Sequence, residues 1–244
     1  MRPILILQHE DLQGPDFLQQ CLGDEGLETL VLRPDQGDRI PGELRDFAGV
    51  AVLGSDHSVH DKLSWIGAER VLLQQALAHE VPVLAHCFGA QQLALVAGAQ
   101  VSRNAWPNVG WSRVWVTPEG RRLFCGAQEL QVFNWHYDTF EIPRGARRLL
   151  FGAHCLNKAF ALGPHLGFQC HLEASEAGLR RWCEAGRAEV EGLRGPAVQR
   201  WGDMLRDLPA RTMQLQRMAR AVYHQWAWQL QGPPRRRVPA GAGA

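Results

Sequence analysis

Three residue types that together support nucleophilic catalysis occur in two short segments of the sequence. Cys87 lies between the apolar run 81–85 and a helix predicted to begin at Phe88. Ala85 and Gly89 flank it two positions away on each side, which is typical of a nucleophile elbow, where larger side chains would collide. The helix N-terminus at such a turn favours the reactive thiolate. The alternative is a buried structural cysteine, a common fate of unpaired cysteines.

His171 and Glu173 are the matching base and acid. A thiolate nucleophile needs a base, and the base needs an acceptor that orients it. Side chains two positions apart on a strand point to the same face, so His171 and Glu173 can meet at a strand end. His171 would take the proton of Cys87 while Glu173 holds the imidazole tautomer, the logic of a Ser-His-Asp triad. Alone, a His-x-Glu pair indicates an ordinary surface ion pair, and the elbow cysteine gives it weight.

The elements that would carry these residues follow an α/β order. Apolar runs alternate with amphipathic stretches, which favours a doubly wound, mostly parallel sheet with flanking helices and ligands at the carboxyl ends of its strands. After Gly98 the short strands indicate antiparallel pairs, and from Ser175 the chain turns helical. The predicted strands are 3–7, 27–32, 46–53, 81–85, 113–116, 131–134, 148–151, 159–162 and 166–170, and the predicted helices are 14–22, 65–80, one from residue 88, 176–185, 186–193 and 210–230.

The chain divides into one main domain and two C-terminal parts. We expect the domain to span residues 1–190 and a helical extension, residues 191–231, to pack on it. Residues 232–244 are rich in glycine, proline and arginine, and this composition predicts a disordered tail.

Composition excludes several classes of protein. The hydrophobic fraction of 45% and the charged fraction of 21% are ordinary for a globular protein, and the net charge of +1 predicts neither a nucleic-acid nor a membrane partner. No segment approaches the ~18 apolar residues of a membrane span. Six cysteines without CxxC pairs, and an apolar start too short for a signal peptide, predict free thiols in the cytoplasm.

Four ordered segments resemble the successive motifs of class I glutamine amidotransferases. They are Cys-Phe-Gly-Ala-Gln at 87–91, Asn-Val-Gly-Trp at 108–111, Phe-Asn-Trp-His-Tyr-Asp at 133–138 and Gly-Phe-Gln-Cys-His-Leu-Glu at 167–173. More narrowly, the chain resembles the stand-alone proteins similar to the amidotransferase domain of GMP synthase. The resemblance covers roughly residues 1–230 and includes the loop 54–61.

This resemblance implies a flavodoxin-like fold and a Cys-His-Glu triad formed by Cys87, His171 and Glu173. The cysteine would attack the side-chain amide of glutamine, release ammonia and form a γ-glutamyl thioester that water cleaves. Backbone N–H groups of Phe88 and of the Gly54–Ser55 loop would form the oxyanion hole. No cofactor is implied, and the residues expected to bind the substrate are Gln91, Gly110, Trp111, His136, Tyr137 and Asp138.

Three positions depart from the family pattern. Leu172 stands where proline is usual, which changes turn stiffness and not chemistry. His86 replaces an apolar residue before the nucleophile and could tune the pKa of the cysteine or simply pack. The Gly54-Ser-Asp sequence replaces a Gly-Gly-Pro-like loop, which affects the second oxyanion donor.

The sequence leaves three functions open. The first is a glutaminase or amidotransferase that delivers ammonia to a separate partner protein or a small molecule, as a monomer or a homodimer. The second is a γ-glutamyl hydrolase or peptidase with water as the acceptor, and the third is a non-catalytic regulatory or binding module on the same fold. His57, His60 and Asp61 have the spacing of a partial metal site, but no further ligands are evident and no metal is expected. His136 and Asp138 favour pocket lining over a second acid/base pair or a purely structural role.

Overall fold

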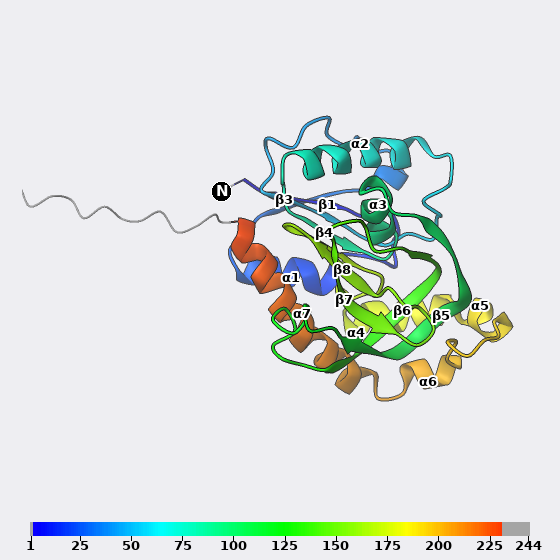
Figure 1. The fold of residues 1–244 in the computed structure, drawn as a ribbon. Helices are drawn as coiled ribbons and strands as arrows, with labels where there is room; N and C mark the ends of the chain where they lie inside the picture. The colour runs from blue at the N-terminus through cyan, green and yellow to red at the C-terminus, as the bar shows by residue number, and fades with distance from the viewer. Residues whose placement is uncertain (1, 231–244) are drawn as a thin grey trace, which may run out of the picture.

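The computed structural model describes residues 2–230 and arranges them around one sheet of nine strands (Figure 1). The strand order is β2-β1-β3-β4-β9-β8-β7-β5-β6. The predicted tail at 232–244, and residue 231 of the predicted extension, lie outside the described residues. The strands are β1 Ile4–Leu7, β2 Thr29–Leu32, β3 Gly49–Val52, β4 Val83–His86, β5 Val101–Val116, β6 Glu129–Phe140, β7 Arg147–Gly152, β8 Ala159–Leu162 and β9 His165–Phe168.

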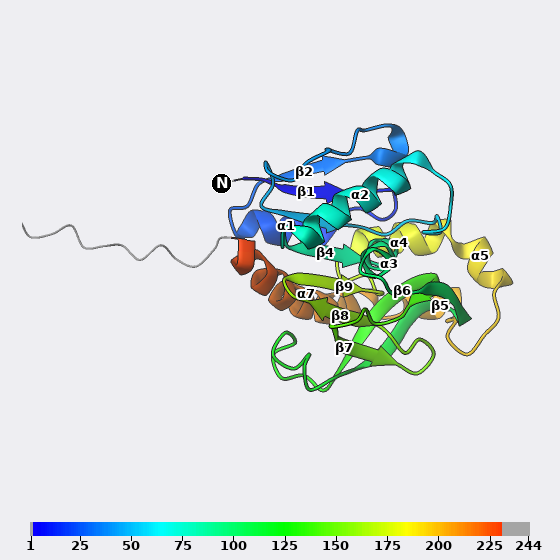
Figure 2. The same ribbon diagram turned by 45° about the horizontal axis from the view of Figure 1, so that its top comes forward.

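The first half of the sheet is parallel and covered on both faces. Strands β2, β1, β3, β4 and β9 pair in parallel, and four of them are completely buried, as central parallel strands should be. Alternate side chains of β1 enter different cores: Leu5 and Leu7 face α2 (Ser64–Ala78) and α3 (Phe88–Val96), while Ile4 and Ile6 face the opposite layer. Figure 2 shows α2 and α3 on one side of the sheet.

The second half of the sheet is antiparallel, and its two largest strands are longer than predicted. The short strands expected at 113–116 and 131–134 are parts of β5 and β6, which span 16 and 12 residues. Polar residues, Pro107 and Gly110 interrupt the apolar pattern of β5, so its length comes from pairing with β6, with a register shift between Arg103 and Asn108. Together the two halves confirm the predicted doubly wound sheet with antiparallel strands in its later part.

The remaining helices confirm the predicted helical C-terminus and add one element. Helix α6 was not predicted, while α4, α5 and α7 lie close to the predicted ranges. Tyr223 and Trp226 of α7 are fully buried in the layer that α1 shares. The helices outside the α2–α3 layer are α1 Asp16–Asp24, α4 Glu176–Ala185, α5 Arg187–Gly192, α6 Trp201–Leu205 and α7 Leu208–Leu230, with a 3-10 turn at Pro34–Gln36. Among residues 2–230, no helix combines the length and the apolar character needed to cross a lipid bilayer.

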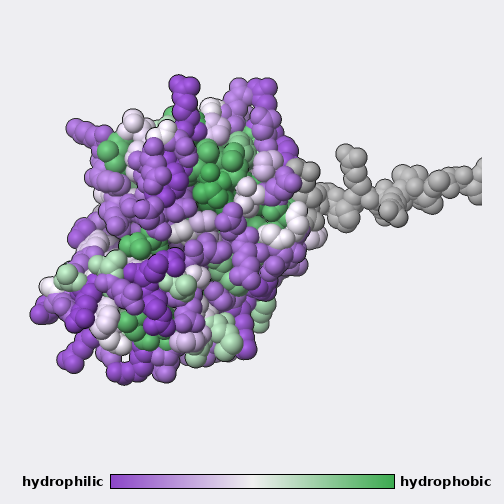
Figure 3. Space-filling view, turned by 180° about the vertical axis from the view of Figure 1, so that it is seen from behind, coloured by the Kyte–Doolittle hydropathy of each residue, from purple (hydrophilic) through white to green (hydrophobic). Residues whose placement is uncertain are grey.

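The surface carries scattered apolar side chains. The face in Figure 3 is mostly hydrophilic and is interrupted by small hydrophobic areas. Trp228, the most exposed of the large apolar side chains among the described residues, is 62% accessible. Single exposed apolar residues are normal on soluble proteins and do not by themselves indicate an interface between protein chains.

Candidate active site

Cys87 occupies a strained turn at the carboxyl end of a central strand. It follows β4, precedes α3, and has φ of 48° and ψ of −109°, a conformation that costs energy for any side chain. A Cβ atom at Gly89 would lie 2.4 Å from the carbonyl oxygen of Val52, so this position requires glycine. The N–H of Cys87 donates to the carbonyl of Phe168 at 2.7 Å. The sequence therefore forms the sharp strand-turn-helix that its small residues predict.

The parallel pairing of β4 with β9 brings His171 and Glu173 beside Cys87. Both follow the last residue of β9, Phe168, in a turn rather than on the strand itself. The Nδ1 atom of His171 lies 2.7 Å from Oε1 of Glu173. Burial alone would lower the pKa of His171, but the Glu173 carboxylate and the neighbouring Cys87 outweigh it and raise this pKa to about 10.

The Nε2 atom of His171 is left free by these contacts. It is buried and makes no hydrogen bond within residues 2–230. The ring packs edge-on against Trp182 with 4.7 Å between centroids, which limits its rotation. An imidazole held by a carboxylate on one nitrogen and free on the other can exchange a proton with a neighbouring thiol.

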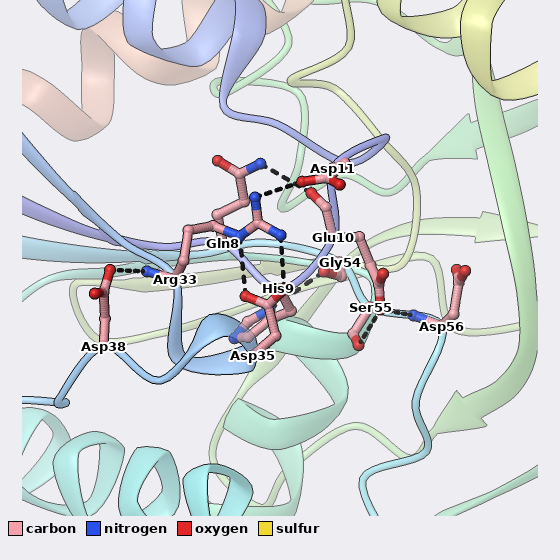
Figure 4. A network of polar contacts seen from close by, with 10 residues as sticks. All are labelled: Gln8, His9, Glu10, Asp11, Arg33, Asp35, Asp38, Gly54, Ser55 and Asp56. Carbon is pink, nitrogen blue, oxygen red and sulfur yellow. Dashed lines mark hydrogen bonds and ion pairs between the residues drawn. The ribbon is translucent and has the colours of Figure 1, made fainter.

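A network from the loop after β1 holds the predicted oxyanion loop (Figure 4). The Nδ1 atom of His9 lies 3.2 Å from the carbonyl oxygen of Gly54. Because a trans peptide is planar, fixing this carbonyl also fixes the direction of the Ser55 N–H on the other side of the bond. Phe88, as the first residue of α3, has an N–H without an intrahelical acceptor. These two amides are the donors that could stabilise an oxyanion.

The remaining contacts of this network restrict the movement of the loop at residues 54–56. Oε1 of Glu10 accepts from the Ser55 hydroxyl at 3.2 Å and from the Asp56 N–H at 3.3 Å, contacts drawn in Figure 4. Nε2 of Gln13 donates to Asp56 at 2.8 Å, and a Cβ atom at Gly54 would lie 1.9 Å from Oε1 of Gln13. Burial and the Glu10 carboxylate raise the pKa of Asp56.

A cavity of about 240 Å³ opens beside Cys87. It contains the predicted residues Ser55, Gln91, His136, Tyr137 and Asp138. Trp135, in the family-like segment 133–138, also lines the cavity, and five further lining residues were not predicted from the sequence: Asp56, His57, Ser58, Arg103 and Glu189. With three carboxylates and one guanidinium around the Cys87 thiol, the cavity suits a small ligand that carries both charges.

The structure does not bring the predicted pocket residues Gly110 and Trp111 to this cavity. A Cβ atom at Gly110 would lie 2.6 Å from Oε1 of Gln199, so the strand is packed closely against the C-terminal region there. Trp111 is 4% exposed, and its Nε1 donates to the carbonyl of Met204 at 3.1 Å. Both residues therefore join β5 to the segment after α5.

Glu189 reaches the cavity from α5, a helix in the C-terminal part of the chain. Its Oε1 accepts a hydrogen bond from Nε1 of Trp135 at 3.3 Å and another from the hydroxyl of Tyr137. Burial and this carboxylate raise the pKa of Tyr137. Nothing in the sequence distinguishes Glu189 from an ordinary surface glutamate, so only the fold identifies it as a lining residue.

The buried amine of Lys158, whose own pKa is lowered by burial, lies against His136. Nζ of Lys158 lies 2.7 Å from Oδ1 of Asn134 and 2.9 Å from Nε2 of His136. Nδ1 of His136 lies 2.9 Å from the carbonyl oxygen of Asp138 and so carries the hydrogen. Burial and the Lys158 charge lower the pKa of His136 well below its ordinary value. Both ring nitrogens are engaged, which favours pocket lining over the alternative of a second acid/base pair.

Gln91 and Gln169 connect this wall of the cavity to the thiol. Nε2 of Gln91 donates to the carbonyl of Asp138 at 3.2 Å and to Oε1 of Gln169 at 3.3 Å. Nε2 of Gln169 lies 3.7 Å from Sγ of Cys87. The pocket wall and the Cys87 thiol are therefore held by one set of amide contacts.

The histidines of the loop after β3 have protein partners. His57 contacts Asp61 at 3.3 Å, and His60 contacts the carbonyl of Val101 at 3.0 Å. Within the part of the chain that the structure describes, no cluster of three or more His, Cys, Asp or Glu side chains could hold a metal ion.

Comparisons with known proteins agree with this geometry. The family model described as glutamine amidotransferase class-I matches residues 16–179. The glutamine-hydrolysing GMP synthase subunit of Saccharolobus solfataricus is 31% identical over 134 residues, which cover 54% of this chain and 70% of that protein. The putative glutamine amidotransferase-like protein YfeJ of Salmonella typhimurium is 25% identical over 196 residues, 77% of this chain and 82% of the relative.

A solved structure extends the similarity to nearly the whole chain. The crystal structure of a glutamine amidotransferase from Methylobacillus flagellatus superposes with a TM-score of 0.90 at 37% identity. The superposition covers 93% of this chain and 94% of that one. It therefore includes most of the C-terminal helices beyond residue 179, where the family match ends.

Proposed function

This chain belongs to the class I glutamine amidotransferase family, and on that basis we propose that it hydrolyses the side-chain amide of glutamine. The observation that carries the proposal is the strained Cys87 turn beside a His171 whose Nδ1 lies 2.7 Å from Glu173. A thiolate and an imidazolium held in this way are the starting state of cysteine-dependent amide cleavage.

In the proposed reaction the Cys87 thiolate attacks the γ-carboxamide carbon of glutamine. The N–H groups of Phe88 and Ser55 stabilise the oxyanion, and His171 donates its proton to the leaving nitrogen, which departs as ammonia. Water, deprotonated by His171, then cleaves the γ-glutamyl thioester and regenerates the thiolate. Glu173 keeps the imidazole oriented through both steps.

The charges around the cavity support an amino-acid substrate. Asp56, Asp138 and Glu189 supply carboxylates for an α-ammonium group, and Arg103 supplies a guanidinium for an α-carboxylate. Arg103 lies over the ring of Tyr137 at 4.5 Å and 3.6 Å from Asp138, so its charge is held at the rim. The name of the archaeal relative, a synthase subunit, supports delivery of the ammonia to a separate partner protein.

The test is intact mass after incubation with a diazo-ketone analogue of glutamine, for the natural protein and for Cys87→Ala. We expect one adduct on the natural protein and none on the variant, together with ammonia release from glutamine by the natural protein alone. An adduct without ammonia release from glutamine, but with cleavage of a γ-glutamyl peptide, would identify a γ-glutamyl hydrolase instead. Neither adduct nor turnover would favour a binding module.

A further inference from the structure

A row of buried polar groups continues from the triad into the C-terminal helix. Oε1 of Glu173 faces His171, and Oε2 of Glu173 lies 3.3 Å from Nδ1 of His86. Nε2 of His86 in turn lies 3.3 Å from the hydroxyl of Tyr223, a residue of α7. All four residues are at most 2% exposed, and they come from β4, the turn after β9 and α7.

The contact between Glu173 and His86 joins two atoms that lack other partners. Neither Oε2 of Glu173 nor Nδ1 of His86 makes a hydrogen bond within residues 2–230, and the 3.3 Å contact between them is an ion-pair distance without hydrogen-bond geometry. A buried carboxylate oxygen without a donor is costly, since its hydration is lost without replacement. The N–H of His86 is the group within the described chain that is placed to supply this donor.

The protons of this row can be assigned from the chemistry of its members. Burial and the Glu173 carboxylate raise the pKa of Tyr223 well above its usual value, so its hydroxyl keeps its proton. Burial lowers the pKa of His86 more than Glu173 raises it, so the ring is neutral. Because Nδ1 of His86 faces a carboxylate oxygen at 3.3 Å, we assign the single hydrogen of the ring to Nδ1, and Nε2 then accepts from the Tyr223 hydroxyl.

We propose that His86 and Tyr223 are positioning residues of the triad, with Tyr223 fixing the tautomer of His86 and His86 holding the second oxygen of Glu173. This rests on the proposed function for its catalytic meaning. Glu173 then accepts from an imidazole on each oxygen, and its plane, and with it the orientation of His171, is set from both sides. Helix α7 thereby belongs to the catalytic apparatus, although it lies beyond the family match at residues 16–179.

Several other titratable groups lie beside this row of buried polar groups. They contribute to any pH dependence that is measured for its variants. Cys87 follows His86 on the turn after β4, and Cys170 precedes His171 on the turn after β9. Cys21 of α1 lies near Tyr223 and raises its pKa further. Burial raises the pKa of Cys170 to about 12, so that thiol stays neutral at working pH.

Replacing His86 by two different residues tests the donor directly. His86→Leu removes the N–H at Glu173, and we expect kcat for glutamine to fall about tenfold to a hundredfold with KM unchanged, the usual scale for a lost orienting partner. The acid limb of the kcat profile should move to higher pH, because an N–H directed at the Glu173 carboxylate favours its ionised form and the variant lacks it. His86→Asn places an amide N–H near the Nδ1 position and should restore most of kcat and the original limb.

Tyr223→Phe and a matched control variant test the contribution of α7 to the triad. Without the hydroxyl, His86 can take either tautomer, and we expect a smaller fall in kcat, about threefold to tenfold, with the acid limb displaced in the same direction. Thr212→Val is the control, because Thr212 is a buried hydroxyl of the same helix whose Oγ1 has no partner among residues 2–230. Thr212→Val should leave kcat and the pH profile unchanged.

A second readout separates this proposal from the glutaminase activity. The rate at which 2-chloroacetamide alkylates Cys87, followed by peptide mass from pH 4 to 9, reports the thiolate–imidazolium pair without any glutamine. A profile that shifts in His86→Leu and Tyr223→Phe but not in His86→Asn or Thr212→Val supports the row, even if the protein fails to hydrolyse glutamine. If His86→Leu does not fold, Tyr223→Phe against Thr212→Val decides. Identical profiles for the natural protein and all folded variants would overturn the proposal.

Discussion

Two buried imidazoles serve the Cys87 site in opposite protonation states. His171 contacts the Glu173 carboxylate, which with the neighbouring Cys87 overcomes burial and raises the pKa of His171 to about 10. His136 lies 2.9 Å from Nζ of Lys158, and burial together with this charge lowers its pKa far below the usual range. Neither side chain is more than 3% exposed, so the sign of the partner, and not the degree of burial, makes the difference.

Under the proposed function, this difference divides the site into a region that would exchange protons and a region that keeps the shape of the pocket. A charged His171 with a free Nε2 can give and take a proton beside the thiol. A neutral His136 with both nitrogens occupied keeps the Asp138 carbonyl in place, and Gln91 donates to the same carbonyl at 3.2 Å. Removing the charge of Glu173, the partner of His171, or of Lys158, the partner of His136, tests this contrast. The two changes are expected to reduce activity by different amounts.

The largest effect should come from Glu173→Gln. The variant removes the charge that keeps His171 protonated and oriented, so we expect kcat/KM for glutamine to fall on the order of 10³- to 10⁴-fold, as when the acid of a Ser-His-Asp triad is neutralised. Steady-state ammonia release measures the change, and circular dichroism reports whether the fold is kept. Glu176→Gln, in an exposed pair with Arg180 nearby, is the control and should retain full activity. A Glu173→Gln enzyme within tenfold of the natural rate would remove the carboxylate from the mechanism.

Lys158→Met should produce a smaller loss on the other side of the site. Without the ammonium, Nε2 of His136 and Oδ1 of Asn134 lose a donor, and the pKa of His136 rises toward its ordinary value. We expect kcat/KM to fall about thirtyfold, consistent with the loss of two buried hydrogen bonds at about 1 kcal/mol each. A new ionisation should appear in KM as His136 becomes able to protonate, and it should lie below the ordinary histidine range because burial still lowers the pKa of His136.

Lys158→Gln separates the charge of Lys158 from its hydrogen bonds. Glutamine can still donate to one of the two acceptors but carries no charge. If the new ionisation appears equally in both variants, the charge of Lys158 keeps His136 neutral. If it appears in Lys158→Met alone, the hydrogen bond from residue 158 to His136 is what keeps the ring neutral. A KM that is independent of pH in both variants would contradict the contrast drawn between the two imidazoles.

The residues that lie close in sequence to a strand end were predictable. Cys87 needs small neighbours at a sharp turn, and Ala85 and Gly89 show this directly. His171 and Glu173 lie beside Cys87 because β9 is a parallel neighbour of β4, an arrangement that the α/β order predicts. Strand β9 ends at Phe168, before both residues. Local pattern was sufficient wherever the chemistry depends on a few consecutive residues.

Residues whose meaning depends on distant contacts were not predictable. Lys158, Tyr223 and Glu189 reach the site from β7–β8, α7 and α5, and no local pattern marks them. Trp111 lies within a family-like motif, yet β5 directs it into the core, where it packs edge-on with Phe133 at 5.3 Å. Strand partners across a sheet are fixed by tertiary pairing, which a single sequence does not show.

A charge at the exposed mouth should matter less than either buried partner. Glu189→Gln keeps an acceptor for Tyr137 and Trp135 but removes a carboxylate from the cavity. Because Glu189 is exposed and water screens it, we expect KM for glutamine to rise about threefold to fivefold with kcat unchanged. Glu191→Gln on the same helix, paired with Arg187 at 2.7 Å, should leave KM unchanged. Equal KM values in all three proteins would remove Glu189 from substrate binding.

The smallest effect at neutral pH concerns a third buried histidine, which has no charged partner. His165 is 3% exposed, its Nδ1 has no hydrogen-bond partner in residues 2–230, and burial lowers its pKa to about 4. Above about pH 6.5 it is neutral in both folded and unfolded chains and contributes no pH dependence. Between pH 6.5 and 4 the unfolded chain binds a proton that the folded chain does not, so the free energy of unfolding should fall by up to about 3 kcal/mol.

His165→Gln isolates this loss, because glutamine cannot titrate. Urea unfolding at pH 7 and at pH 4.5 should show a smaller loss of stability for His165→Gln than for the natural protein, with the remaining carboxylates contributing equally to both. Equal losses would mean that His165 is protonated in the folded protein, and burial alone would then be insufficient to keep an imidazole neutral here. The neutrality of His136 would in that case depend entirely on Lys158, which makes this control the sharpest measure of what the ammonium adds.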